Sequence, residues 1–149
     1  MAKDVTPVEN TQVIEDLYNY LKKINIGIDI AIEYMDDKTP AMCVKQISTA
    51  YKTNENILGG YTAELPFAIY HRAKVDDTNN VLAITRPLNI LASVFELETE
   101  NQFPNLSLHG YKPVSIEMVS TPGDDSGKEN KVATFMAMYK LTYKRKSKF

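Results

Sequence analysis

The residues best suited to chemistry are two histidines and one cysteine, His71, His109 and Cys43. Histidine is the usual general base near neutral pH, and an activated cysteine is a strong nucleophile. His71 falls in a strand-like pattern and His109 near a Gly-Tyr turn, with no serine or cysteine motif beside either. Cys43 falls in a candidate strand, where a small buried thiol is the ordinary role. We therefore predict structural roles for all three and no enzymatic activity.

Acidic residues occur as three neighbouring pairs, Asp36-Asp37, Asp76-Asp77 and Asp124-Asp125. Hard cations bind carboxylate oxygens, but a calcium loop places them at alternating positions, which none of the pairs does. Each pair lies where a turn or a helix cap already accounts for it. The segment Gly123–Lys128 does not have the spaced second glycine or the hydroxyl residue of a phosphate-binding loop. The sequence predicts no metal and no cofactor.

Charge is unevenly distributed along the 149 residues, whose net charge is −2. The last ten residues contain five basic residues and no acid, so the rest has 12 basic and 19 acidic residues, a net charge of −7. Such a body argues against a general nucleic-acid-binding domain, which needs a basic face. The basic tail suits contact with a polyanion or with an acidic neighbouring subunit, or is simply a solvated strand end.

A single cysteine forms no internal disulfide, which fits a reducing compartment. No stretch approaches the roughly 20 apolar residues that cross a bilayer, so we expect no membrane partner.

Apolar residues at helical spacing predict two helices. The first spans about Thr11–Lys23, with residues 1–10 as an irregular N-terminal arm. The second ends near Glu98. It either begins near Asn79 and is kinked at Pro87, or begins at Pro87 behind a Thr85 cap. We favour the longer helix.

Alternating apolar residues predict strands, and the sequence Thr121–Gly127 predicts an exposed hairpin tip between the last two of them. Pro66 should lie at a strand start, a bulge or an edge, because proline donates no ladder hydrogen bond. The predicted strands span approximately residues 26–34, 41–48, 62–75, 113–120 and 131–144.

This order of elements predicts an α+β fold. We expect a single two-layer domain over residues 11–149, with a mixed or antiparallel sheet of four to five strands and both helices packed on one face.

Four segments carry a resemblance to a known family: Val13–Leu21, Glu64–Tyr70, Arg86–Ala92 and Ala137–Tyr143. Together they resemble the small minor capsid or tail terminator proteins of long-tailed phages and prophages of Gram-positive bacteria. The resemblance covers the chain from about Thr11 onward, and its motifs are hydrophobic patterns rather than invariant catalytic residues.

The resemblance implies a structural virion protein of the viral tail and neck, assembled in the bacterial host cytoplasm. It would form a homo-oligomeric ring, typically a hexamer, on the head-proximal end of the tail tube. The ring would end tube polymerisation and provide the surface for head-tail joining. The implied partners are further copies of the chain, the tail tube protein, the head-tail connector or stopper protein, and genomic DNA passing nonspecifically through the ring.

Three groups of residues are candidates for these contacts. The segment Thr49–Gly60 is more apolar than a free loop requires, so it contacts a neighbouring subunit or the tube, or it folds back on its own core. The tip Gly123–Asn130 could reach an adjacent ring. The basic tail could line the DNA passage, where nonspecific phosphate contacts suffice, although lysines also protect edge strands. The subunit or tube candidates are Tyr51, Asn54, Ile57, Leu58, Asp124 and Asp125, and the DNA or acidic-neighbour candidates are Lys144, Arg145, Lys146 and Lys148.

The nearest alternatives are another head-tail joining protein (an adaptor or head-closure protein) or a tail-tube subunit, which would polymerise alone into open tubes. A small non-viral α+β ligand-binding domain or enzyme is the alternative from another class, and it requires a pocket with converging polar groups.

Overall fold

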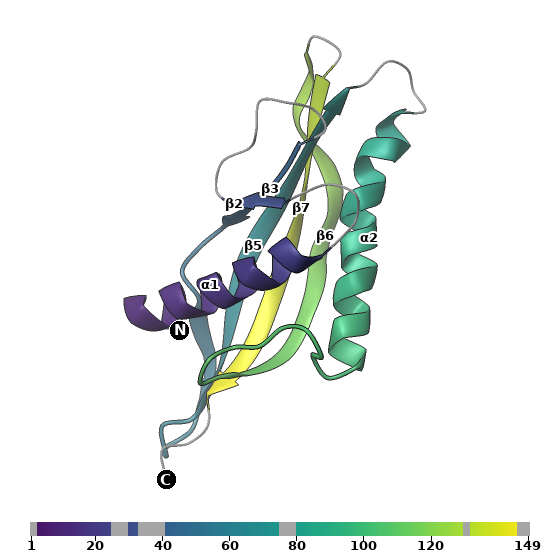
Figure 1. Cartoon of the computed structure of the whole chain (residues 1–149). Helices are drawn as coiled ribbons and strands as arrows, with labels where there is room; N and C mark the ends of the chain where they lie inside the picture. Colours follow the sequence, from purple (N-terminus) through teal and green to yellow (C-terminus); the bar gives the residue numbers. More distant parts are fainter. Residues whose placement is uncertain (1–2, 25–29, 33–40, 75–79, 130–131, 146–149) are drawn as a thin grey trace.

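The computed structural model describes residues 3–24, 30–32, 41–74, 80–129 and 132–145 (Figure 1). These ranges form two helices and a seven-stranded sheet, which confirms the α+β class with more strands than predicted. The helices are α1 (Pro7–Lys23) and α2 (Asn80–Glu100). The strands are β1 (Lys3–Asp4), β2 (Ile30–Ile32), β3 (Ala41–Gln46), β4 (Tyr51–Glu55), β5 (Tyr61–Lys74), β6 (Lys112–Glu129) and β7 (Val132–Arg145).

Helix α1 begins before the predicted start at Thr11. The Thr6 hydroxyl accepts a hydrogen bond from the Glu9 amide at 3.2 Å, and Pro7 suits the first helical position because no donor is needed there. Just upstream, β1 pairs antiparallel with β4. The prediction of an irregular arm is therefore wrong for the described part of residues 1–10. The capping residue, Thr6, precedes the apolar residues whose helical spacing predicted the helix, so the spacing could not reveal the true start.

Strand β5 is central to the sheet. It pairs with β7 along its whole length, from Tyr61 opposite Arg145 to Lys74 opposite Val132. Its other edge is shared, because β4 pairs with its first residues and β3 with its later ones. All of these pairs are antiparallel, whereas β2 and β3 run parallel. Most of the predicted strand over residues 26–34 lies outside the described residues, and β2 is the part that is described.

Pro66 lies inside β5, so the prediction that it would occupy a strand start, a bulge or an edge is wrong. The shared edge supplies the reason. Pairing with β4 ends at Glu64 and pairing with β3 begins at Phe67, so Pro66 lies between the two. Its carbonyl still accepts from the Ile47 amide at 3.1 Å. Proline's missing N–H group therefore lies at the point where the strand paired with this edge of β5 changes from β4 to β3, so no ladder hydrogen bond is lost there.

Helix α2 contains Pro87 in its interior, as the longer of the two predicted helices requires. The proline removes one helical hydrogen bond. In compensation, α2 buries Ile84, Leu88, Leu91 and Phe95 against the sheet. The hydroxyl of Tyr139 on β7 also donates to the Leu88 carbonyl at 2.9 Å. Tertiary packing therefore holds a helix that local propensity disfavours.

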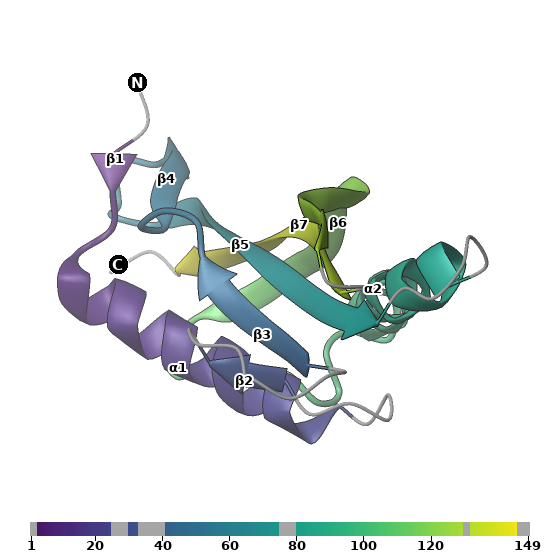
Figure 2. The ribbon, with the colours of Figure 1, turned by 90° about the horizontal axis from the view of Figure 1, so that it is seen from above.

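Both helices cover the same face of the sheet (Figure 2). An aromatic cluster joins the layers, with Phe95 of α2 edge-on to Tyr139 at a centroid distance of 5.3 Å and to Phe67 at 6.2 Å. Tyr20 of α1 meets Phe95 at 6.3 Å. Such contacts stabilise beyond the buried area itself. Among the described residues, neither helix combines the length and apolarity needed to span a membrane.

Strand β6 continues to Glu129, through the segment predicted as the hairpin tip. The turn-forming residues produce register shifts instead, between Ser120 and Gly123 and between Asp124 and Lys128. Extra residues in one strand are accommodated as bulges, which glycine and aspartate tolerate well. Strand β6 is therefore longer than predicted, and the predicted hairpin tip lies within it.

Candidate assembly surfaces

The predicted contact residues separate into two groups at opposite ends of the sheet. Asn54 pairs with Thr62, which in turn pairs with Lys144, so the β4–β5 hairpin and the end of β7 lie together. Asp124 pairs with Phe135, near the start of β7. We call the first group's location the basic end and the other the tip end. Lys146 and Lys148 lie outside the described residues.

The apolar hairpin loop at the basic end is rigidly built. The Asn56 side-chain oxygen accepts from the amides of Leu58 and Gly60 at 3.0 and 2.9 Å. Gly59 has a φ of 90°, which favours glycine. Ile57 is fully exposed and Leu58 is 46% exposed. Of the two predicted alternatives, the loop tip therefore does not fold back on its own core.

Tyr51 is half-buried rather than displayed. Its hydroxyl donates to Glu64 at 2.7 Å across the β4–β5 pair, and this hydrogen bond raises its pKa. Asn54 is exposed beside the register shift of β4. The exposed apolar surface of this hairpin is thus the Ile57-Leu58 pair.

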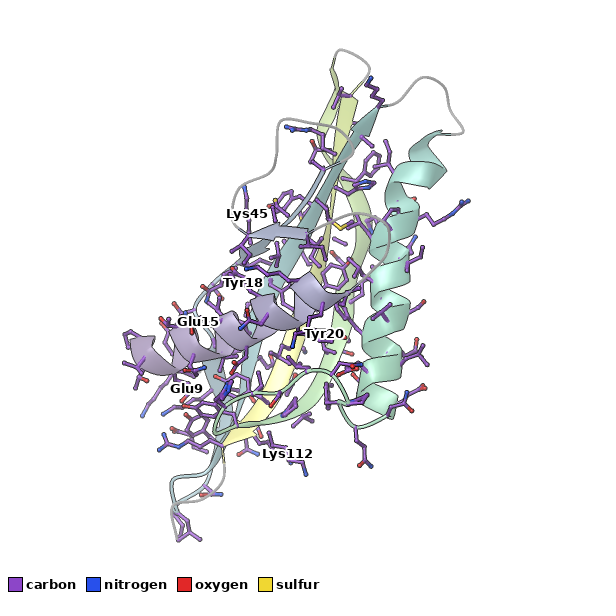
Figure 3. All side chains as sticks on the ribbon, viewed as in Figure 1. Glu9, Glu15, Tyr18, Tyr20, Lys45 and Lys112 are labelled. Atoms are coloured by element: carbon purple, nitrogen blue, oxygen red, sulfur yellow. The ribbon has the colours of Figure 1, made fainter. Side chains whose placement is uncertain are left out.

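A buried carboxylate lies beneath the basic end. Glu9 is 3% exposed and accepts hydrogen bonds from the hydroxyls of Tyr61 and Tyr143, the latter at 2.7 Å. Figure 3 shows Glu9 on α1, facing the lower part of the sheet. Burial, followed by the hydrogen bond to Glu9, raises the pKa of Tyr61 to about 12, and burial likewise raises the pKa of Tyr143. Both tyrosines therefore stay protonated donors at neutral pH.

Arg145 and Lys52 lie over the Tyr61 ring, at 5.8 and 4.5 Å from its centroid. A hydrogen bond with Tyr61 raises the pKa of Arg145. Cations over an aromatic face are attracted by its quadrupole. Arg145 is therefore positioned by the cluster around Glu9, whereas Lys144 beside it is exposed.

A loop over residues 101–111 forms one wall of a groove at this end. The Glu98 carboxylate, 4% exposed, accepts from the amides of Asn105 and Leu106 at 2.8 and 2.6 Å. Asp16 of α1 accepts from the backbone and ring nitrogens of His109 at 2.9 and 2.7 Å. One buried acid from each helix thus fixes the loop.

The groove beneath this loop has a volume of about 1240 Å³. Its apolar and aromatic lining includes Phe103, Tyr111 and Val114, and its charged lining is Lys112, Lys144 and Arg145 with no acid among the described residues. Phe103 has a φ of 58°, which is unusual for a bulky residue. Figure 3 places Lys112 at the lower end of the sheet, below α2. The groove suits an anionic segment with apolar character.

Lys112 and Lys144 are direct partners across β6 and β7. Like charges placed opposite each other destabilise a strand pair. Within the part of the chain that is described, no ion pair joins either lysine to a carboxylate. The arrangement keeps an uncompensated positive charge at the mouth of the groove.

The opposite face of the sheet carries no helix among the described residues. The partly buried side chains on it include Pro66, Tyr70, Met136 and Met138. Lys140 bridges Glu64 and Glu117 there, at 3.4 and 3.6 Å. Methionine adapts readily to a partner surface. This face is therefore a second candidate contact surface.

Of the three residues considered for chemistry, His109 belongs to the loop that forms the groove wall, whereas His71 and Cys43 lie elsewhere. The Nδ1 atom of His71 donates to the Ile84 carbonyl at 2.7 Å, and burial lowers its pKa. Cys43 is buried. No group of three His, Cys, Asp or Glu residues that could hold a metal ion occurs among the described residues.

Sequence reasoning missed Glu9, Asp16, Glu98 and Lys112. Glu9 lies in the segment that was predicted as an irregular arm and Asp16 lies inside the first predicted helix, and spacing along the chain does not reveal which acids are buried. Lys112 stands next to a proline at a strand start, which is visible in the sequence. Its pairing with Lys144 is not visible, because the two residues are 32 positions apart.

Comparison with known proteins leaves the family open. No protein-family model matches the chain, and no curated protein matches it either.

Proposed function

We propose that the protein is a tail terminator, which forms a closed ring on the head-proximal end of a phage tail tube. One observation carries this proposal: a single rigid sheet presents different chemistry at its two ends. The basic end displays an exposed apolar hairpin and a cationic groove, and the tip end carries the Asp124-Asp125 segment. A terminator must match the growing tube on one side and withhold that interface on the other, so its two sides differ.

The long antiparallel core suits this role. β5 and β7 pair over 14 residues each, and both helices brace one face. Heterologous contacts between identical subunits give a ring when the rotation closes. The resemblance of the sequence supports six copies. Lys144 and Arg145 would then lie near transiting DNA, where weak phosphate contacts are sufficient.

The test is particle mass and electron microscopy of the purified protein, with and without a tail tube protein. A terminator yields closed rings or monomers alone, and it shortens tubes and caps them when tube protein is added. Open-ended tubes formed by this protein alone would show that it is a tube subunit. Capped tubes that do not bind head connectors would favour a different joining step.

A further inference from the structure

We propose that the outer face of α2 binds the same face of a second copy of this chain, as an antiparallel helix pair about a two-fold axis. Residues spaced alternately four and three positions apart form this face: Arg86, Ile90, Ser93, Leu97 and Glu100. The contact goes beyond the proposed function and does not depend on it, because it joins two copies of the chain through one helix of each.

The outer face lies on the side of α2 that is turned away from the sheet. The helix packs on the sheet through Leu88, Leu91 and Phe95, which are fully buried. Because an α-helix turns once in about 3.6 residues, Ile90 and Leu97 point away from that contact. They are 41% and 57% exposed, and Figure 1 shows α2 along one margin of the molecule. Two large apolar side chains, two turns apart, are therefore aligned on a solvent-facing surface.

A hollow of about 300 Å³ on this face has the arrangement of a helix-packing hole. Its lining consists of Thr85, Arg86, Asn89, Ile90 and Ser93. The last four occupy positions i, i+3, i+4 and i+7, which is the set of four residues that receives a knob from a facing helix. The hole is open because Ser93 is small. One turn after Ser93, Leu97 is a knob of suitable size.

An antiparallel copy brings this knob and this hole together. In a pair centred at Ser93, positions equally far from Ser93 on its two sides face each other. Leu97 lies four positions after Ser93, and Asn89, at the middle of the hole, lies four positions before it. Each copy therefore places its Leu97 in the hole of the other. A two-fold contact requires this self-complementarity of one surface.

The charges at the two ends of the face favour the antiparallel arrangement. Arg86 lies seven positions before Ser93 and Glu100 seven positions after it, so each faces the other across the axis. A parallel pair would instead place like charges side by side, which is unfavourable. Both side chains are exposed, and no ion pair within the described part of the chain involves either of them. A second copy supplies the opposite charge to both.

One helix pair makes a small interface. The face extends from Arg86 to Glu100, roughly 21 Å along the helix axis. Such a contact buries less than the area of about 1,200 Å² at which stable complexes begin, so association is reversible and depends on concentration. The pairing doubles the mass of whatever species forms, because monomers become dimers and single rings become paired rings.

Removal of the knob tests the pairing by sedimentation analysis of particle mass. Leu97→Ser removes the leucine from both copies, so it should weaken association at least about 100-fold and give particles of half the parent's mass. Folding loses little packing, because this side chain is more than half exposed. The matched control is Val119→Ser on β6, at a side chain 60% exposed, which should associate like the parent.

A charge swap tests the direction of the two helices. Arg86→Glu and Glu100→Arg each place like charges at both ends of the pair, so each variant alone should associate about 10-fold more weakly than the parent. An equimolar mixture should recover the parent's association, because each substituted side chain then faces an opposite charge. Lys22→Glu and Glu15→Arg reverse exposed charges on α1 and serve as controls.

A cross-link tests the position of the two-fold axis. Ser93→Cys places two thiols opposite each other at the axis, and Cys43 is buried. Mild oxidation should give covalent dimers at least about 10-fold faster than it does for Ser107→Cys, whose exposed thiol meets another only by random collision.

Several results would overturn the helix pair. A parent without pairing at about 1 mM would do so, because even a contact of about 4 kcal/mol is half-formed there. So would a Leu97→Ser variant that associates like the parent, a charge-swap mixture that recovers nothing, or equal cross-linking rates for the two cysteine variants. Loss of tube capping by Leu97→Ser without any change in particle mass would assign the outer face to the tube protein instead. Pairing without capping would disprove the terminator function alone, and capping without pairing would disprove only the helix pair.

Discussion

Glu9 connects the start of the chain to its last strand. It is buried in α1 and receives hydroxyl donors from β5 and β7. A buried charge is tolerated only when hydrogen bonds replace its hydration. The cluster therefore fixes where the helix, the basic end and Arg145 lie relative to each other.

Replacing Tyr143 with phenylalanine should destabilise the protein. The change leaves the Glu9 carboxylate with one donor fewer, and a hydrogen bond to a charged group contributes about 1.5–3 kcal/mol. Urea unfolding measures the loss. The matched control is Tyr51→Phe, whose bond to Glu64 is partly solvated and should be worth about 1 kcal/mol or less. Equal losses in the two variants would contradict a special role for the Glu9 cluster.

Alkaline pH should weaken the fold through the tyrosines. The folded-state pKa of Tyr61 is raised to about 12 from an ordinary value of 10.0. The folded protein therefore holds a proton that the unfolded chain releases first, so this contribution is complete below pH 10 and disappears between pH 10 and about 12.

Urea midpoints measured from pH 9 to 12 test this expectation. The Tyr61→Phe variant should lose less stability over the interval than the parent does. An identical pH dependence in both proteins would assign the alkaline loss to other groups.

Residue types revealed only part of the candidate surface. Ile57 and Leu58 were found because two large apolar residues in a glycine-rich loop are unusual, and the structure leaves both exposed. The buried acids Glu9, Asp16 and Glu98 could not be recognised. Their partners are Tyr143, His109 and Leu106, and the first two are 134 and 93 positions distant.

Among the elements, the loop over residues 101–111 depends on its anchors more than on its own packing. Most of its side chains are exposed, with Leu106 and Leu108 buried. Its backbone is held from below by Glu98 at the end of α2. The wall of the groove is thus held at Asn105 and Leu106 by a carboxylate of α2, in addition to the Asp16 contact at His109.

Glu98→Ala should loosen this loop locally. Three donors of Asn105 and Leu106 lose their acceptor, which costs about 2 kcal/mol when water replaces it incompletely. Hydrogen exchange at the Asn105 and Leu106 amides should become much faster, with the sheet amides little changed. Glu96→Ala, an exposed acid on the same helix, is the control. Retained protection in the Glu98 variant would mean that packing alone holds the loop.

The alternation of apolar and polar residues predicted a strand well where one face of that strand is buried along its whole length. The β5 and β7 spans differ from prediction by one residue at each end, because alternation persists along both strands. The start of α1, the strand β1 and the extension of β6 were missed. Each depends on a cap or on pairing with a distant strand, which periodicity within one segment does not contain.

The molecule as a whole is an elongated slab with unlike ends. The helix layer stiffens one face, and the apolar hairpin and groove are gathered at the basic end (Figure 1). Binding surfaces held on rigid elements need little reorganisation on contact. This asymmetry is what an adaptor between two different partners requires.

Ile57→Ser should weaken capping of tail tubes without unfolding the protein. The side chain is fully exposed, so folding loses no packing. Burying an isoleucine at an interface contributes about 1.5–3 kcal/mol, equivalent to roughly 10- to 100-fold in affinity. Tube length against added protein is the measurement. Val8→Ser, at a site 80% exposed on α1, is the control. Unchanged capping would remove the hairpin from the tube contact.

The link between Glu9 and Tyr143 also governs when the protein becomes competent during synthesis. Helix α1 is among the first elements to emerge from the ribosome. The hydroxyl that donates to its buried Glu9, that of Tyr143, belongs to a strand that is synthesised almost last. Arg145 and the lower wall of the groove arrive with that same strand. A truncated or still-growing chain therefore lacks the completed basic end, including the cationic lining of its groove.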